Sequence, residues 1–306
     1  MTECERLIAN GTFTRDFFKP EVRCDFLVTE ERKKIWAIEL DLLLQFDGVC
    51  KKYGLRYFLL VGSILGAIRH KGVIPWDDDI DVGMLRPDYD KFLTLAHEFS
   101  APYFLQVPGK DAGYFYAFAK IRNSRTTGLS VNFRYQPFNH GICLDVFPLD
   151  EWAVPDGEST YKKINELCYS QSTYMRMSNP NLSEQDKVRV SKYSGRNPIS
   201  VNSEIDRLAH SYSNCNTGYL AQDTCGVYGF QRNTYPAEEF ASDVLWDFEG
   251  FKFPIPVGYD SILRTLYGDY MQFPPVEQRG AWHGGAIMNP DIPYKRFLQD
   301  NYQIGG

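Results

Sequence analysis

The chain has 306 residues, 43% of them hydrophobic, which is enough to bury the core of one large domain or of one domain with an added lobe. Its formal net charge is -6 at pH 7, whereas proteins that bind along a nucleic acid polymer are usually basic, so we exclude that class of partner. The N-terminus does not resemble a signal peptide, and no stretch approaches the roughly 18 apolar residues of a membrane span. We expect a globular protein of the cytoplasm, either free or at the inner face of the cytoplasmic membrane.

The seven cysteines support the same compartment. They are odd in number, are spread along the chain, and form no C-x-x-C pair and no zinc-finger spacing. We therefore expect ordinary thiols in a reducing environment.

The chain from residue 30 to residue 70 predicts a helix, a strand and a second helix. Apolar residues recur at helical spacing over 30–53, and Gly54 follows as a stop, which indicates an amphipathic helix whose apolar stripe packs into the core. The apolar run over 57–61 indicates a buried strand, after which Gly62 and Ser63 open a short helical segment.

The following segment predicts a mixed α/β structure. Pro87 suits the first turn of a helix that turns Phe92, Ala96 and Phe99 toward the core. Short apolar or alternating runs indicate further strands around residues 79–82, 103–107, 117–122 and 142–147.

The second half of the chain has weaker patterns. Residues 152–193 are polar with helical spacing, 214–251 show no regular pattern, and prolines flank a short helix over 259–267. We divide the chain into a catalytic core over residues 30–150 and a helical and irregular part over residues 151–306 that completes the site.

Four aspartates within five positions of the segment IPWDDDIDVG form the clearest candidate site. Strand alternation places Asp79 and Asp81 on one face, with Asp77 on the same parity and Asp78 on the opposite one. Two neighbouring carboxylates suit Mg²⁺, or alternatively Mn²⁺, because these cations take oxygen ligands and offset negative charge during phosphoryl transfer. A solvated acidic turn is the competing interpretation, but apolar residues flank the cluster on both sides.

A third acid and two cations lie on later predicted strands. In ICLDVF, alternation points Asp145 away from the apolar face, where it can join Asp79 and Asp81 as a metal ligand or as the base for an attacking hydroxyl. In AFAKIRN, alternation places Lys120 and Arg122 together, which fits either a site for phosphate groups or an exposed basic edge.

Other residues near the acids are candidate phosphate ligands. Gly62 and Ser63 lie at a helix start, where backbone N–H groups can receive a phosphate. Arg69 follows on the same helical segment and fits either a phosphate or a structural pair with a carboxylate. His283 stands in the glycine-rich segment RGAWHGG, which has the composition of a loop that covers a site.

A calcium-binding EF-hand loop also carries acids at alternating positions. The match fails because Val82 stands where that loop needs glycine and Asp88 stands where it needs a bidentate glutamate. We therefore reject an EF-hand.

The segment VGSILGAIRHKGVIPWDDDIDVG, over 61–83, resembles the signature of the LicD family, which also includes the fukutin-related transferases of animals. The resemblance extends to AKIRNSRTT, GICLDVFPLD and FEGFKFPIPVGYDSILRTLYGDYMQFPP, and it covers most of the chain from about residue 30 to residue 283. It implies a nucleotidyltransferase-like α/β (α+β) fold with a mixed sheet, flanking helices and a C-terminal extension. It also implies that the Gly-Ser turn and the acids Asp79, Asp81 and Asp145 form the site.

The resemblance further implies transfer of phosphocholine, or of glycerol or ribitol phosphate, from a CDP-linked donor to a sugar hydroxyl of a cell-surface glycan or its lipid-linked precursor. CMP is then the leaving group, Lys120 and Arg122 steady the diphosphate, and acceptor contacts are expected within residues 152–247. The animal relatives carry a cysteine-rich zinc site and a membrane anchor, neither of which this sequence matches. Two alternatives stay open: a nucleotidyltransferase that installs a nucleoside monophosphate, and a non-catalytic protein that binds a glycan or phosphocholine.

Overall fold

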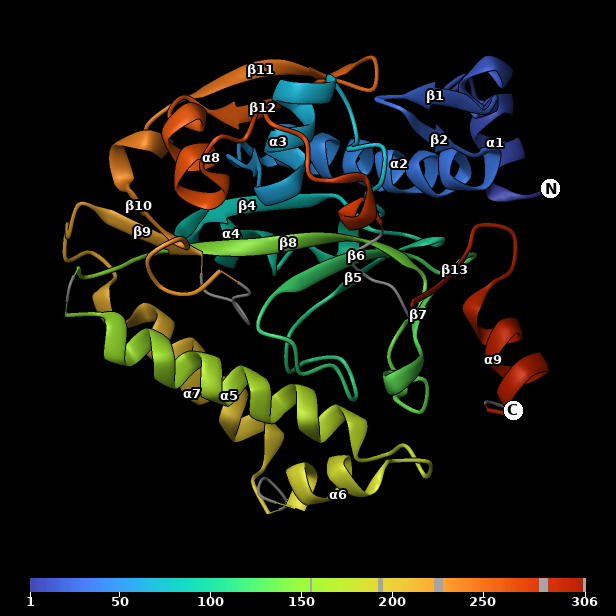
Figure 1. Ribbon diagram of the computed structural model, residues 1–306. Coiled ribbons are helices and arrows are strands. Elements are labelled where there is room, and N and C mark those ends of the chain that lie inside the picture. Colours follow the sequence, from blue (N-terminus) through green and yellow to red (C-terminus); the bar gives the residue numbers. More distant parts are fainter. Residues whose placement is uncertain (155, 192–194, 223–227, 281–285, 305–306) are drawn as a thin grey trace.

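The computed structural model describes residues 1–154, 156–191, 195–222, 228–280 and 286–304. A mixed sheet crosses the middle of the molecule, with helices on both sides of it (Figure 1). This arrangement confirms the expected mixed α/β fold with flanking helices. The strands of this sheet are β3 (Phe58–Leu59), β4 (Asp81–Leu85), β5 (Tyr103–Gln106), β6 (Ala119–Asn123), β8 (Ile142–Glu151), β9 (Tyr219–Gln222) and β10 (Thr234–Pro236).

The long strand β8 organises the sheet because it borders three other strands. It pairs in parallel with β4 and antiparallel with both β6 and β9. The outer strands add to these, with β3 on β4, β5 on β6, and β10 on β9. Two strands from beyond residue 151 therefore extend the sheet that the first half of the chain begins.

Smaller elements surround this sheet. Three antiparallel pairs lie outside it: β1 (Glu21–Arg23) with β2 (Phe26–Val28), β11 (Asp243–Phe248) with β12 (Phe251–Pro256), and β7 (Thr127–Ser130) with β13 (Ala286–Asn289). The helices are α1 (Glu3–Ala9), α2 (Glu30–Tyr53), α3 (Val61–His70), α4 (Arg86–Phe92), α5 (Glu158–Arg176), α6 (Glu184–Ser191), α7 (Pro198–Ala209), α8 (Tyr259–Tyr267) and α9 (Tyr294–Tyr302). None of the helices in the described ranges is long and apolar enough to cross a bilayer.

Helix α2 has the bounds that its sequence predicts. The Thr29 side chain accepts a hydrogen bond from the Arg32 N–H at its start, and Gly54 ends it in the left-handed conformation at φ 63°. The helix packs on β6 and β8 and buries Trp36 and Phe46 completely. The apolar stripe is therefore core packing, as expected.

Three of the sequence expectations differ from the structure at element boundaries. The strand expected over 57–61 is limited to Phe58–Leu59, because α3 already begins at Val61. The acidic strand begins only at Asp81, so the preceding aspartates lie in irregular backbone. Helix α4 ends at Phe92, and Ala96 lies in a separate short 3-10 helix over 96–98.

Helices α5, α6 and α7 lie together on one side of the sheet (Figure 1). Helix α5 packs on α7, and the two bury a small hydrophobic cluster of their own that includes Trp152, Ile164 and Ile205. The helical character expected for residues 152–193 is thus confirmed, and the helices form a layer distinct from the main core.

We predict that Arg86→Met lowers the free energy of unfolding by about 3–5 kcal/mol, because it leaves the carboxylate of Asp150 buried without its partner. Arg86 binds this carboxylate through Nε and a second guanidinium nitrogen, at 2.5 and 2.8 Å, and Asp150 is fully buried. The matched control is Lys252→Met, which breaks an exposed ion pair with Asp247 and should cost less than about 1 kcal/mol. Urea unfolding of both variants checks this, and equal losses would contradict it.

Candidate active site

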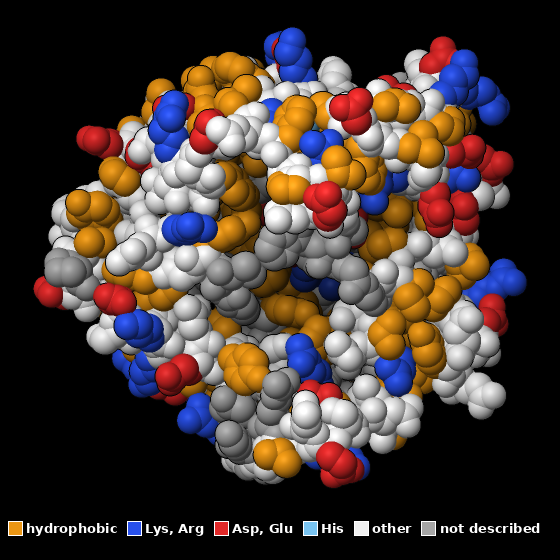
Figure 2. Space-filling model, in the orientation of Figure 1, with side chains coloured by type: hydrophobic (Ala, Val, Ile, Leu, Met, Phe, Trp, Pro, Cys, Tyr) orange, Lys and Arg blue, Asp and Glu red, His pale blue; other side chains and the backbone are white. Residues whose placement is uncertain are grey.

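The candidate site is a cavity of about 910 Å³ between the sheet, α3 and α8. Its walls include Asp77, Asp79, Asp81 and Asp145. The space-filling view, in the orientation of Figure 1, shows a hollow near the centre of this face with hydrophobic side chains visible inside it (Figure 2). A volume near the upper end of the usual range of about 300–1,000 Å³ suits a ligand as large as a nucleotide.

Strand register brings three charged side chains together on the cavity face of the sheet. Asp81 on β4 lies opposite Asp145 on β8, and Asp145 lies opposite Lys120 on β6. Residues that face each other across neighbouring strands point to the same side, so the three side chains form a row. The Lys120 Nζ lies 2.5 and 2.6 Å from the two carboxylate oxygens of Asp145.

The three aspartates before β4 form a second, tighter acidic group. Carboxylate oxygens of Asp77, Asp78 and Asp79 all lie within 4.8 Å of one another. Strand alternation predicts that Asp78 points to the opposite face. This prediction is wrong, because these residues precede the strand and their side chains do not alternate. Asp78 therefore belongs with the acids from which the sequence pattern separated it.

This crowding of carboxylates is electrostatically costly. Burial raises the pKa of Asp77 and of Asp81 well above the usual value, and the neighbouring Asp79 raises both further. Beneath them, burial together with Asp79 and Asp78 raises the pKa of Glu39, whose Oε2 has no hydrogen-bond partner among the described residues. Crowded carboxylates with an unpartnered buried oxygen beside them fit a hard divalent cation, which would relieve both costs.

Helices α2 and α3 fix the backbone of the acidic segment. The Arg32 guanidinium and the Trp36 indole N–H both donate hydrogen bonds to the carbonyl oxygen of Asp77, at 2.7 and 3.2 Å. From α3, the Ser63 hydroxyl oxygen accepts a hydrogen bond from the Asp81 N–H at 2.9 Å. The apolar stripe of α2 predicts only core packing and does not reveal these contacts.

Gly62 on α3 makes room for the acids. A Cβ at this position would lie 2.9 Å from the Asp77 Oδ2, which is closer than real Cβ contacts allow. Gly62 also lines the cavity, as does Arg69 two turns further along α3. The predicted Gly-Ser segment thus lies beside the acids, with Ser63 bonded to their backbone and Gly62 against a carboxylate.

The remaining predicted cations lie in different surroundings. Arg69 donates hydrogen bonds to the carbonyl oxygens of Tyr270 and Gln272, so it binds backbone, and it forms no ion pair with a carboxylate of the described residues. Arg122 is buried beyond the cavity and donates to Gln106 and to the Gly141 carbonyl, at 2.6 and 2.7 Å.

His283 lies outside the described residues. Arg279, from the same segment, donates hydrogen bonds to the carbonyl oxygens of Pro274 and Cys24 and lies over the Trp76 ring at 4.9 Å. The start of the glycine-rich segment is therefore held beside Trp76, a residue that lines the cavity.

Two tyrosines from the second half of the chain complete the wall, and the sequence analysis did not single them out. The rings of Tyr228 and Tyr267 lie 5.9 Å apart, and both residues line the cavity. Burial, a hydrogen bond to Tyr228 and the nearby Asp77 and Asp81 together raise the pKa of Tyr267 well above its usual value. Tyr267 therefore keeps its proton and can donate a hydrogen bond within the site.

We predict that Gly62→Ala weakens the binding of Mn²⁺ about tenfold or more, because the new methyl group must displace the Asp77 carboxylate while the backbone stays in place. The matched control is Gly48→Ala in the middle of α2, where a Cβ would meet nothing within 4 Å. Isothermal titration calorimetry with Mn²⁺ measures both affinities. Equal affinities in the two variants would show that Asp77 does not contribute to the cation site.

Comparison with known proteins shows which family this sequence resembles. Residues 54–179 match the family described as LicD/FKTN/FKRP, nucleotidyltransferase domain. The lipopolysaccharide cholinephosphotransferase LicD of Haemophilus influenzae is 29% identical over 247 residues, which cover 80% of this chain and 92% of that protein. The human ribitol 5-phosphate transferase FKRP is 51% identical over 41 residues, which cover 13% of this chain and 8% of that protein. The chain therefore carries a nucleotidyltransferase domain of the LicD/FKTN/FKRP family, and over most of its length it is similar to a LicD transferase.

Proposed function

We propose that the protein transfers phosphocholine, or a related phospho-alcohol, from a CDP-linked donor to a sugar hydroxyl of a cell-surface glycan or its precursor, and releases CMP. The observation that carries the proposal is the similarity to the cholinephosphotransferase of Haemophilus influenzae, which extends over 92% of that protein. The similarity to a ribitol 5-phosphate transferase is the reason for including other phospho-alcohols.

The cavity supports this reaction chemically. The acceptor hydroxyl attacks the phosphorus nearer the alcohol, a new O–P bond forms, and the bond from that phosphorus to the bridging oxygen breaks to release CMP. Asp145 lies on the cavity face and can accept the hydroxyl proton, while Lys120, ion-paired to it, holds its orientation. Positioning contributes more than base strength in phosphoryl transfer, so an oriented carboxylate is sufficient.

We assign the cation site to Asp79 and Asp81 together with Asp77. These three carboxylates line the cavity and are crowded by one another, whereas the carboxylate of Asp145 is already bound by Lys120. Mg²⁺ held there supplies positive charge against the donor diphosphate. Arg69, which also lines the cavity, is the nearest candidate on α3 for a donor phosphate.

A nucleotidyltransferase activity is the second candidate, because the matched domain of the family is described as a nucleotidyltransferase domain. It uses the same carboxylates but retains the nucleoside monophosphate on the acceptor and releases pyrophosphate from a nucleoside triphosphate. Product analysis therefore separates the two activities.

We predict that one of CDP-choline, CDP-glycerol and CDP-ribitol raises the melting temperature of the protein in the presence of Mg²⁺ and yields CMP on transfer. Asp81→Asn should abolish this shift. The same variant should raise the melting temperature of the ligand-free protein, because it removes one of the repelling buried carboxylates. Differential scanning fluorimetry and chromatography of the nucleotide products measure these effects.

The control is Asp247→Asn, which changes an exposed carboxylate paired with Lys252 and should leave the donor shift intact. Pyrophosphate release from CTP without CMP release from a CDP-alcohol would favour the nucleotidyltransferase. A donor shift that survives Asp81→Asn, with no product from either substrate class, would favour a binding protein.

A further inference from the structure

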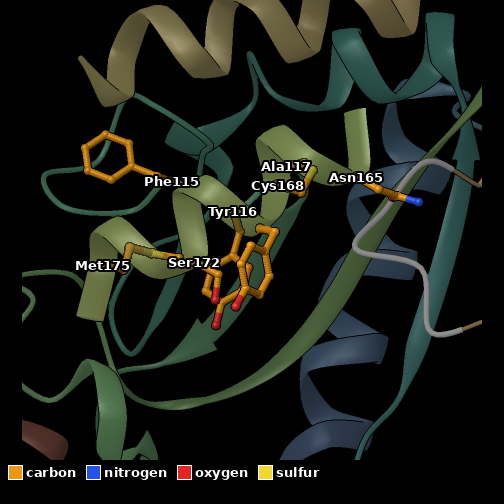
Figure 3. A pocket seen from close by; sticks show the side chains of 8 residues that line it. Phe115, Tyr116, Ala117, Asn165, Cys168, Ser172 and Met175 are labelled. Carbon is orange, nitrogen blue, oxygen red and sulfur yellow. The ribbon is translucent and has the colours of Figure 1, made fainter. Parts of the chain in front are cut away.

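A second, smaller cavity lies beside the candidate active site. Its volume is about 270 Å³, and it lies between α5 and the chain segment 115–117 (Figure 3). Figure 3 shows Asn165 at one end of the view, Phe115 at the other, and Tyr116 between them. We call it the Tyr116 pocket.

One face of α5 forms a wall of the Tyr116 pocket. Asn165, Cys168, Ser172 and Met175 follow one another at intervals of three or four residues, so they share one face of the helix. Phe115, from the segment across from this face, and Met175 belong to one hydrophobic cluster, whereas Cys168 belongs to another. The pocket therefore lies at the seam between two packed clusters.

The walls combine aromatic rings with neutral hydrogen-bonding groups. Tyr116 and Tyr169 supply ring faces, and Asn165 and Ser172 supply an amide and a hydroxyl. The Oδ1 of Asn165 is buried and has no hydrogen-bond partner within the part of the chain that the structure describes. A buried acceptor without a donor is costly, and a ligand hydroxyl would satisfy it.

Tyr116 connects this pocket to the reaction centre, because it lines both cavities. Its ring centroid lies 5.5 Å from the Nζ of Lys120, which pairs with Asp145. A molecule in the Tyr116 pocket would therefore contact the same ring that lies beside Lys120, the ion-pair partner of Asp145.

We propose that the Tyr116 pocket binds a sugar ring of the acceptor, and this inference rests on the proposed function. A sugar ring offers several hydroxyl groups for Asn165 and Ser172 and apolar C–H faces for the aromatic rings. None of the described residues that line the pocket is a cation that could match the charge of a phosphate, and at about 270 Å³ the pocket is much smaller than the cavity assigned to the nucleotide.

The test measures sugar binding without any donor, by saturation-transfer difference NMR. The probes are the methyl glycosides of galactose, glucose, N-acetylgalactosamine and N-acetylglucosamine. We expect ring-proton signals from at least one of them with the wild-type protein. Asn165→Ala should weaken the affinity about five- to tenfold, since one hydrogen bond is lost. Ser172→Phe should abolish it by filling the pocket.

The matched control is Glu166→Ala, which changes an exposed residue next to Asn165 on α5 and should leave sugar binding unchanged. Circular dichroism and a cooperative thermal unfolding transition without ligand check that each variant is folded. Absence of signal from every sugar, or equal signals in wild type and Ser172→Phe, would overturn the inference.

The two proposals fail in distinguishable ways. If the donor shift is intact but Ser172→Phe does not alter sugar binding, the inference that the Tyr116 pocket binds the sugar is wrong, and the proposed transferase activity is unaffected. If sugar binding is lost in Ser172→Phe but no CDP-linked donor binds, the pocket is supported and the proposed donor is wrong.

Discussion

The site depends on one constraint, which is that several carboxylates share a small and partly buried volume. The register of β4, β8 and β6 aligns Asp81, Asp145 and Lys120 in a row, and Lys120 forms an ion pair with Asp145. The remaining acids repel one another, and burial raises the pKa of Asp77 and Asp81. Repulsion between these carboxylates destabilises the ligand-free fold, and binding of a cation together with a phosphorylated donor would relieve that repulsion.

Helix α2 shows how the surrounding fold holds this arrangement in place. The apolar side chains of α2, including Phe46, pack into the core. Arg32 and Trp36 on the same helix donate hydrogen bonds to the carbonyl oxygen of Asp77. Glu39, also on α2, lies beneath the acids. A segment that lacks strand pairing is thus fixed by side chains from a rigid helix. Precise positioning on rigid elements is what phosphoryl transfer requires, since the protein contributes mainly geometry and charge to that reaction.

The sequence predicts what depends on local periodicity. The bounds of α2 and the position of α8 follow from spacing, and strand alternation places Asp145 on the side of β8 away from its apolar residues. Alternation fails for Asp78, because it assumes a strand that begins only at Asp81. Alternation also places Arg122 on the same face of β6 as Lys120. The cavity does not extend as far as Arg122, which alternation alone does not reveal. Glu39, Tyr228 and Tyr267 reach the site through tertiary packing, which a single sequence does not reveal.

The two cavities are built from different parts of the fold, and this separation bears on specificity. Asp81 and Asp145 lie on the central sheet, where register fixes them, whereas the Tyr116 pocket is formed by α5 and by a connecting segment. Substitutions along the pocket face of α5 would therefore change which acceptor fits without disturbing the carboxylates. Tyr116 is the point where the two sites meet, because it contacts Lys120 on one side and lines the pocket on the other. On this arrangement, acceptor choice can vary among proteins that keep the same donor chemistry.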